Sequence, residues 1–138
     1  MIAFRPIADT DVEAVVALWK ACGLTRPWND PYKDISFARG KPNSELLIGE
    51  WQGMLAASVM VGHDGHRGML YYLAVDPVVQ GKGFGKAAVG AAEAWLKERG
   101  IWKINLLVRS ENEKVRRFYE KLGYDISDVF CMARKIVG

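Results

Sequence analysis

The stretch Gln80-Gly81-Lys82-Gly83-Phe84-Gly85 decides how the rest of the chain is interpreted. It follows an apolar run at residues 69–75 and leads into an alanine-rich helical pattern that begins at Lys86. Glycines at alternate positions allow a tight turn whose N–H groups point into one small volume, and the helix adds unpaired N–H groups and the positive end of its dipole. Such a turn suits a phosphate or another small anion. A glycine-rich turn is equally typical of a simple tight connection, so the other segments have to decide between the two interpretations.

The overall composition limits the classes of protein to consider. With 138 residues and 15.4 kDa the chain has the size of one ordinary domain, and we predict that residues 1–138 form a single domain. Half of the residues are hydrophobic and a quarter are charged, as in globular proteins. The mild net charge of +3 argues against a nucleic-acid partner. The apolar runs are too short for a membrane span and the N-terminus lacks a signal-peptide pattern, so we expect a cytoplasmic protein with no membrane partner.

The cysteines and histidines do not form a recognisable metal motif. Cys22 and Cys131 are far apart in the sequence and are expected to be buried thiols in a reducing compartment. His63 and His66 share one loop, but no third ligand follows at metal-binding spacing. We therefore predict no metal.

Apolar periodicity and turn signals predict alternating blocks of strands and helices. The expected strands are 2–6, 45–51, 54–61, 69–75, 103–108 and 130–136, and the expected helices are 12–22, 31–39, 84–99 and 112–122. Antiparallel strands come first and a strand–helix–strand unit follows. This order predicts an α/β fold of the mixed α+β kind, with a mostly antiparallel central sheet of about six to seven strands and helices on both faces.

Two common nucleotide-binding folds do not fit this order. In a dinucleotide-binding fold the glycine turn opens the domain and an acidic residue ends a later strand, and neither holds here. A P-loop ends in Lys-Ser/Thr, which the segment 81–86 lacks.

Two motifs in a fixed order carry a family resemblance. Gln80-x-x-Gly83-x-Gly85, preceded by Tyr72-Leu-Ala-Val-Asp-Pro77, resembles the acetyl-CoA signature of the GNAT superfamily, the GCN5-related N-acetyltransferases. The block Asn112-x-x-Val-x-x-Phe-Tyr119-x-x-x-Gly-Tyr124 resembles a later helix of the same family, and the predicted element order agrees over essentially the whole chain. The segments 26–31 and 65–68 further resemble an uncharacterised bacterial branch, the YpeA-like proteins.

The resemblance implies acetyl-CoA as co-substrate and a set of residues that would hold it. In the family the strand before the glycine turn splays at a bulge, and pantetheine pairs with its backbone, here at Leu73 and Val75. The pyrophosphate would lie on the N–H groups of residues 81–86. Three basic residues could either contact the outer phosphates or simply be solvated, and the sequence favours neither role: Lys82, Lys86 and Arg109. The implied cofactor-binding residues are Leu73, Val75, Gln80, Gly81, Lys82, Gly83, Phe84, Gly85, Lys86, Asn112 and Tyr119.

The same resemblance assigns catalytic roles. Tyr119 is at the general-acid position, where a phenol with a pKa of about 10 can protonate a departing thiolate whose thiol has a pKa of about 8.5. The N–H of Val75 would polarise the thioester carbonyl. The position of the glutamate base of well-known members is occupied by Met69, so we expect a water relayed by Tyr71 or Tyr72 to take the proton of the amine. Glu50 or Asp30 is the alternative base.

The acceptor pocket is expected at the first two helices and their connector. Arg26, Trp28 and Asn29 could bind the acceptor together with Tyr72, whereas Trp28 could instead fill a core edge and Asp30 is favoured as a helix cap. An Arg26 that faces the pocket would suit an acceptor with a carboxylate. Strand alternation predicts that Tyr72 and the preceding tyrosine face opposite sides of the sheet.

These inferences lead to one function and one alternative. We predict an N-acetyltransferase that transfers an acetyl group from acetyl-CoA to a primary amine of a small molecule, an amino acid or a peptide or protein N-terminus, by direct nucleophilic attack. A non-catalytic CoA-binding or acyl-CoA-sensing module is the alternative. The expected partners are acetyl-CoA and an amine acceptor. A homodimer is possible, but the sequence does not decide the oligomeric state.

Overall fold

The computed structural model describes residues 1–138, which form two compact units, Met1–Asn105 and Leu106–Gly138. The first unit contains β1 (Ala3–Pro6), the short 3-10 helix η1 (Asp9–Asp11), α1 (Val12–Ala21), α2 (Pro31–Ala38), β2 (Ser44–Trp51), β3 (Met54–His63), β4 (Gly68–Val75), the 3-10 helix η2 (Pro77–Val79) and α3 (Phe84–Glu98). The second unit contains α4 (Glu113–Lys121). None of the helices is long and apolar enough to span a membrane.

The sheet of the first unit is antiparallel throughout, in the order β1-β2-β3-β4. The mixed fold class is as predicted, but the sheet has four strands rather than six to seven. Residues 103–108 contribute only an isolated parallel bridge between Ile104 and Gly68, and residues 130–136 form no strand. Both segments have the apolar composition of strands, but a strand also needs a partner ladder, which composition does not specify.

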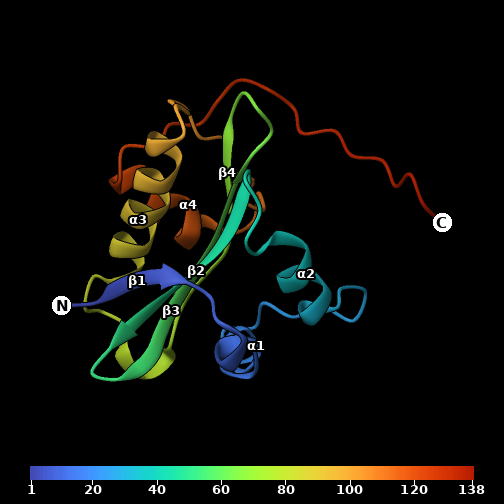
Figure 1. Ribbon diagram of the computed structural model, residues 1–138. Coiled ribbons are helices and arrows are strands. Elements are labelled where there is room, and N and C mark those ends of the chain that lie inside the picture. The colour runs from blue at the N-terminus through green and yellow to red at the C-terminus, as the bar shows by residue number, and fades with distance from the viewer. The chain divides into compact units, whose positions relative to one another are not determined.

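Helices cover both faces of this sheet (Figure 1), as predicted. On one face α1 and α2 enclose a core that contains Trp19, Ile35, Leu46 and Ile48. On the other face α3 buries Ala88, Val89, Ala92 and Leu96. Its close approach depends on Gly68, because a Cβ at this position would lie 2.5 Å from a methyl group of Leu96.

Local sequence signals account for most of the element boundaries. Asp30 caps α2, because its carboxylate accepts hydrogen bonds from the N–H groups of Tyr32 (2.9 Å) and Lys33 (3.4 Å). Pro31 follows at the first helical position, where a missing N–H costs nothing. Between β2 and β3, Gln52 and Gly53 both have positive φ values, of 51° and 74°, which is typical of a tight hairpin turn.

Candidate functional site

The glycine turn has the backbone geometry of an anion site. Gly81 and Gly83 have φ values of +83° and +81°, in the left-handed region that glycine adopts without strain. Gly83 is the N-cap of α3 and no side chain caps this helix, so the first N–H groups of α3 have no side-chain partner. The space beside Gly81 and Gly83 is open, since a Cβ at either position would meet no atom within 4 Å. An oxyanion can therefore reach these N–H groups.

The other residues of the turn are held by packing and by one side-chain hydrogen bond. Phe84 is buried and packs against Trp51, with ring centroids 5.4 Å apart. Lys82 lies over the same Trp51 ring, with its ammonium 5.2 Å from the centroid. The side-chain amide of Gln80 donates to the carbonyl of Val75 at 3.2 Å. Gly85 is half-buried and Lys86 is exposed. Gln80 therefore connects the turn to the end of β4, and Phe84 connects it to the end of β2.

The strand before the turn carries the predicted bulge. Tyr71 lies opposite Met60 and Ala74 lies opposite Ser58, so two β4 residues, Tyr72 and Leu73, face the single residue between Ser58 and Met60. Tyr72 has a φ of +51°, which costs an ordinary residue about 1–2 kcal/mol. β4 is also the last strand of the sheet, and beyond its bridge at Gly68 no strand pairs with its outer side. An extended amide-bearing ligand can add to such an edge.

The N–H group of Val75 points to this open edge. Asp76 donates its N–H to the carbonyl of Ala56 on β3 at 2.8 Å. Along an antiparallel strand, the backbone N–H and C=O groups of successive residues face the partner strand and the opposite side in alternation. Because the N–H of Asp76 faces β3, the N–H and C=O of Val75 face the outer side of β4. Its carbonyl accordingly accepts side-chain hydrogen bonds, from Gln80 and from the thiol of Cys22 at 3.3 Å. Burial raises the pKa of this thiol.

Tyr71 and Tyr72 lie on the same face of the sheet, so the alternation prediction is wrong. Tyr71 is paired with Met60, which packs against the core beneath α1 and α2, and Tyr72 packs against the same core. The left-handed backbone at Tyr72 breaks the alternation. Tyr71 is 47% exposed, and its hydroxyl lies 3.7 Å from the sulfur of Met69.

The hydroxyl of Tyr72 reaches a carboxylate that the sequence analysis did not select. It donates to Oδ2 of Asp34 at 2.6 Å. Burial, followed by the hydrogen bond to Asp34, raises the pKa of Tyr72. Asp34 is half-buried in the first turn of α2, forms no ion pair and accepts no backbone N–H. Position 34 gave no signal in the sequence, because a carboxylate near a helix start is ordinary.

The connector between α1 and α2 is only partly available for binding. The guanidinium of Arg26 donates to the backbone carbonyls of Gly23 (2.7 Å) and Thr25 (2.9 Å), which satisfies the end of α1. The N–H of Asn29 donates to the carbonyl of Arg26 at 3.1 Å, so it closes the turn. Trp28 is 71% exposed and does not fill a core edge. Trp28 therefore remains the free aromatic group of this loop.

Neither acidic alternative for the base is free. Asp30 is occupied as the cap of α2. Glu50 forms an ion pair with Arg5, which also binds Asp11 at 2.7 Å. The hydrogen bond from Arg5 lowers the pKa of Asp11. A carboxylate held by a cation is a poor proton acceptor, so these contacts do not favour Glu50.

In the second unit, Tyr119 lies in α4 as predicted, and Asn112, expected as the first residue of this helix, is its N-cap. The side chain of Asn112 caps the helix by accepting the N–H of Val115 at 3.2 Å. Tyr119 is buried and packs edge-to-face against Phe118 and Tyr124, with ring centroids 5.1 and 5.4 Å away. Burial alone raises the pKa of Tyr119 to about 12.

The family follows from the comparison with known proteins. The model of the acetyltransferase (GNAT) family matches residues 12–124, most of the chain. The chain belongs to this family. It is also 40% identical over 133 residues to an acetyltransferase of Yersinia enterocolitica, which covers 96% of this chain and 94% of that protein. An acetyltransferase of Pectobacterium atrosepticum is 42% identical over the same share of both chains. This GNAT protein is therefore an acyltransferase, as the sequence motifs implied.

Solved structures with low sequence identity support the fold. A predicted acetyltransferase of Clostridium acetobutylicum, solved with acetyl-CoA, has a TM-score of 0.76 at 17% identity and covers 97% of this chain and 96% of its own. The ribosomal-protein-S18-alanine N-acetyltransferase of Escherichia coli has a TM-score of 0.77 at 23% identity, over 92% of this chain and 79% of its own.

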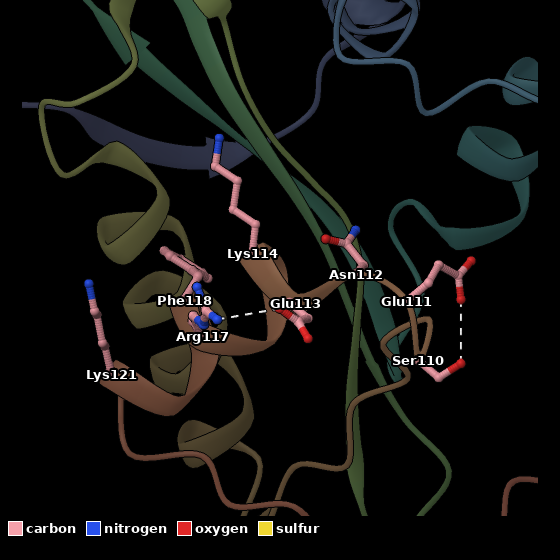
Figure 2. A pocket seen from close by; sticks show the side chains of 8 residues that line it. All are labelled: Ser110, Glu111, Asn112, Glu113, Lys114, Arg117, Phe118 and Lys121. Atoms are coloured by element: carbon pink, nitrogen blue, oxygen red, sulfur yellow. Dashed lines mark hydrogen bonds and ion pairs between the residues drawn. The ribbon is translucent and has the colours of Figure 1, made fainter.

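The second unit of this GNAT protein also has a cavity, lined by both basic and acidic side chains, that the sequence analysis missed. The cavity has a volume of about 720 Å³ and is lined by Ser110, Glu111, Asn112, Glu113, Lys114, Arg117, Phe118 and Lys121. Figure 2 shows the side chains of Lys114 and Lys121 extending from the helix, with Arg117 bonded to Glu113 at 3.3 Å. The available signal was three basic residues at helical spacing, i, i+3 and i+7.

Proposed function

We propose that this GNAT protein transfers the acetyl group of acetyl-CoA to a primary amine. One observation carries the proposal: the bulged, open edge of β4 leads through the short helix η2 into the glycine turn, which no side chain caps. The edge is suited to the amides of pantetheine, and the N–H groups of the turn are suited to a pyrophosphate. The acetyl-CoA complex of the Clostridium acetobutylicum protein, which has this fold, supports the choice of ligand.

The proposed chemistry is a direct attack without a covalent enzyme intermediate. The neutral amine nitrogen forms a bond to the thioester carbon, and the developing oxyanion accepts a hydrogen bond from the N–H of Val75. The C–S bond then breaks, the nitrogen loses a proton to water and the thiolate gains one. We assign the second proton to Tyr119, whose phenol is protonated at neutral pH and regains a proton from solvent after the transfer.

We further propose that the amine approaches from the face of β4 that carries Tyr71 and Tyr72. Tyr71 is exposed there and can hold the water that takes the proton from the amine. Asp34 lies beside Tyr72, and its charge, which no cation balances, attracts an ammonium group toward this face. The acceptor could be a small molecule, an amino acid or a peptide or protein N-terminus. Proteins of this fold include the ribosomal-protein-S18-alanine N-acetyltransferase of Escherichia coli and a glucosamine-6-phosphate N-acetyltransferase of Arabidopsis thaliana.

Two measurements test this function. Calorimetry should detect binding of acetyl-CoA and CoA at physiological concentrations, and absence of binding would exclude the proposal. Thiol release from acetyl-CoA should then rise in the presence of at least one member of an amine panel that includes spermidine, glucosamine 6-phosphate and N-terminal alanyl peptides.

A non-catalytic CoA-binding or acyl-CoA-sensing module is the second candidate. It is favoured by Met69 at the position of the usual glutamate base, and by the engagement of both Asp30 and Glu50. This candidate predicts tight CoA binding with no amine-dependent thiol release.

A further inference from the structure

The bulge residue Tyr72 has a backbone conformation that its residue type disfavours. Its φ of +51° lies in the left-handed region, and in bulges with such a residue the position is usually occupied by glycine. An aromatic residue keeps this conformation only when the surrounding contacts enforce it, and such outliers cluster at functional sites. The contacts of Tyr72 therefore identify the residues that control the bulge.

Three elements hold Tyr72, each through a different part of the residue. From β3, the hydroxyl of Ser58 donates to the backbone carbonyl of Tyr72 at 2.8 Å. From α1, the Trp19 ring stacks on the Tyr72 ring with centroids 3.7 Å apart and an interplanar angle of 11°. From α2, Asp34 accepts the phenol hydrogen at 2.6 Å. Carbonyl, ring and hydroxyl are thus all restrained.

Ser58 is the centre of this arrangement. It is the one buried polar side chain of the core, with no exposed surface. Its hydroxyl accepts a hydrogen bond from Nε1 of Trp19 at 2.9 Å while it donates to Tyr72. A buried polar chain in which every member is satisfied strongly favours one geometry, because any shift leaves a buried group unpaired. The chain Trp19–Ser58–Tyr72 therefore defines one shape of the bulge.

We propose that Ser58 and Trp19 are positioning residues for the acyl-CoA site. They hold the bulge of β4, and with it the outward backbone groups of Leu73 and Val75, in the shape that receives the pantetheine arm. Both side chains are fully buried, so they act through Tyr72 and do not touch the ligand. This inference rests on the proposed function, because it needs pantetheine at the edge of β4.

The test compares two ligands on the full-length Ser58→Ala variant. CoA uses both the edge of β4 and the glycine turn, whereas 3′-phosphoadenosine 5′-diphosphate carries only the nucleotide end and uses the turn alone. We expect the Kd of CoA to rise about tenfold in calorimetry, while that of the nucleotide stays within about twofold of wild type. A wild-type protein that binds neither ligand would contradict the proposed function itself.

Two further variants separate the hydrogen bonds from a general loss of stability. Ser58→Cys nearly keeps the side-chain volume, but its thiol is a weak hydrogen-bond donor. This variant should therefore weaken CoA binding about as much as Ser58→Ala does. Trp19→Phe keeps an aromatic ring on Tyr72 but removes the Nε1 donor together with part of the buried ring volume, so it should weaken CoA binding about threefold. This variant replaces Ser58→Ala if Ser58→Ala does not fold. The inference would be overturned if the variants bound CoA and the nucleotide more weakly by the same factor. It would also be overturned if variants that circular dichroism shows to be folded bound CoA with unchanged affinity.

Discussion

The glycine turn can be tested by adding one methyl group at Gly83. With φ at +81°, an alanine there would occupy the left-handed region at a cost of about 1–2 kcal/mol, although its Cβ would meet no protein atom within 4 Å. The backbone is expected to relieve this strain by rotating the first N–H groups of α3. If one or two hydrogen bonds to a charged phosphate are lost, at about 1.5–3 kcal/mol each, CoA affinity falls by at least about tenfold.

Gly90 supplies the matched control in the same helix. It is exposed in the middle of α3, its φ is not positive, and a Cβ there would also meet nothing within 4 Å. Gly90→Ala should therefore stabilise the helix by up to about 1 kcal/mol and leave CoA affinity unchanged. Calorimetry gives the affinities, and thermal unfolding gives the stabilities, where Gly83→Ala should lower Tm by about 3–8 °C. If Gly83→Ala bound CoA as tightly as Gly90→Ala, the turn would not be the pyrophosphate site.

Three further predictions concern Tyr119 and Asp30. Tyr119→Phe should lower turnover at least about 100-fold with the Kd of CoA within about twofold, and equal turnover would remove the phenol from the mechanism. Because burial raises the pKa of Tyr119 from 10.0 to about 12, this tyrosine stabilises the folded state fully below pH 10, and the contribution is lost as the pH rises from 10 to about 12. Urea unfolding across that range should show a shallower decline for Tyr119→Phe than for wild type. Asp30→Ala should cost about 1 kcal/mol in urea unfolding through loss of the α2 cap, and a large loss of turnover with unchanged stability would contradict the cap assignment.

Features with local causes could be predicted from the sequence. The glycine turn and the cap at Asp30 depend on a few neighbouring residues, and the structure has both where the sequence analysis expected them. The boundaries of α1, α2, α3 and α4 agree to within one or two residues for the same reason.

Features with tertiary causes could not be predicted. The left-handed backbone of Tyr72 depends on Trp19 and Ser58, which lie 53 and 14 positions earlier in the chain. The strands expected at 103–108 and 130–136 failed because their residue types suit a strand but no ladder forms. Asp34 was missed because only the fold brings it to the hydroxyl of Tyr72.

This division has a functional consequence. The part of the site that would bind CoA is largely built from one continuous segment, from the bulge at Tyr72 to the first turn of α3. The part proposed to receive the amine combines Tyr71 on β4 with Asp34 on α2, and the exposed Trp28 lies in the loop before α2. Tyr72 belongs to both parts, because its backbone forms the bulge and its hydroxyl binds Asp34. If both proposals hold, we expect a change in the hydrogen bond between Asp34 and this hydroxyl to alter the proposed CoA edge, so that a single side chain would couple acceptor recognition to cofactor geometry.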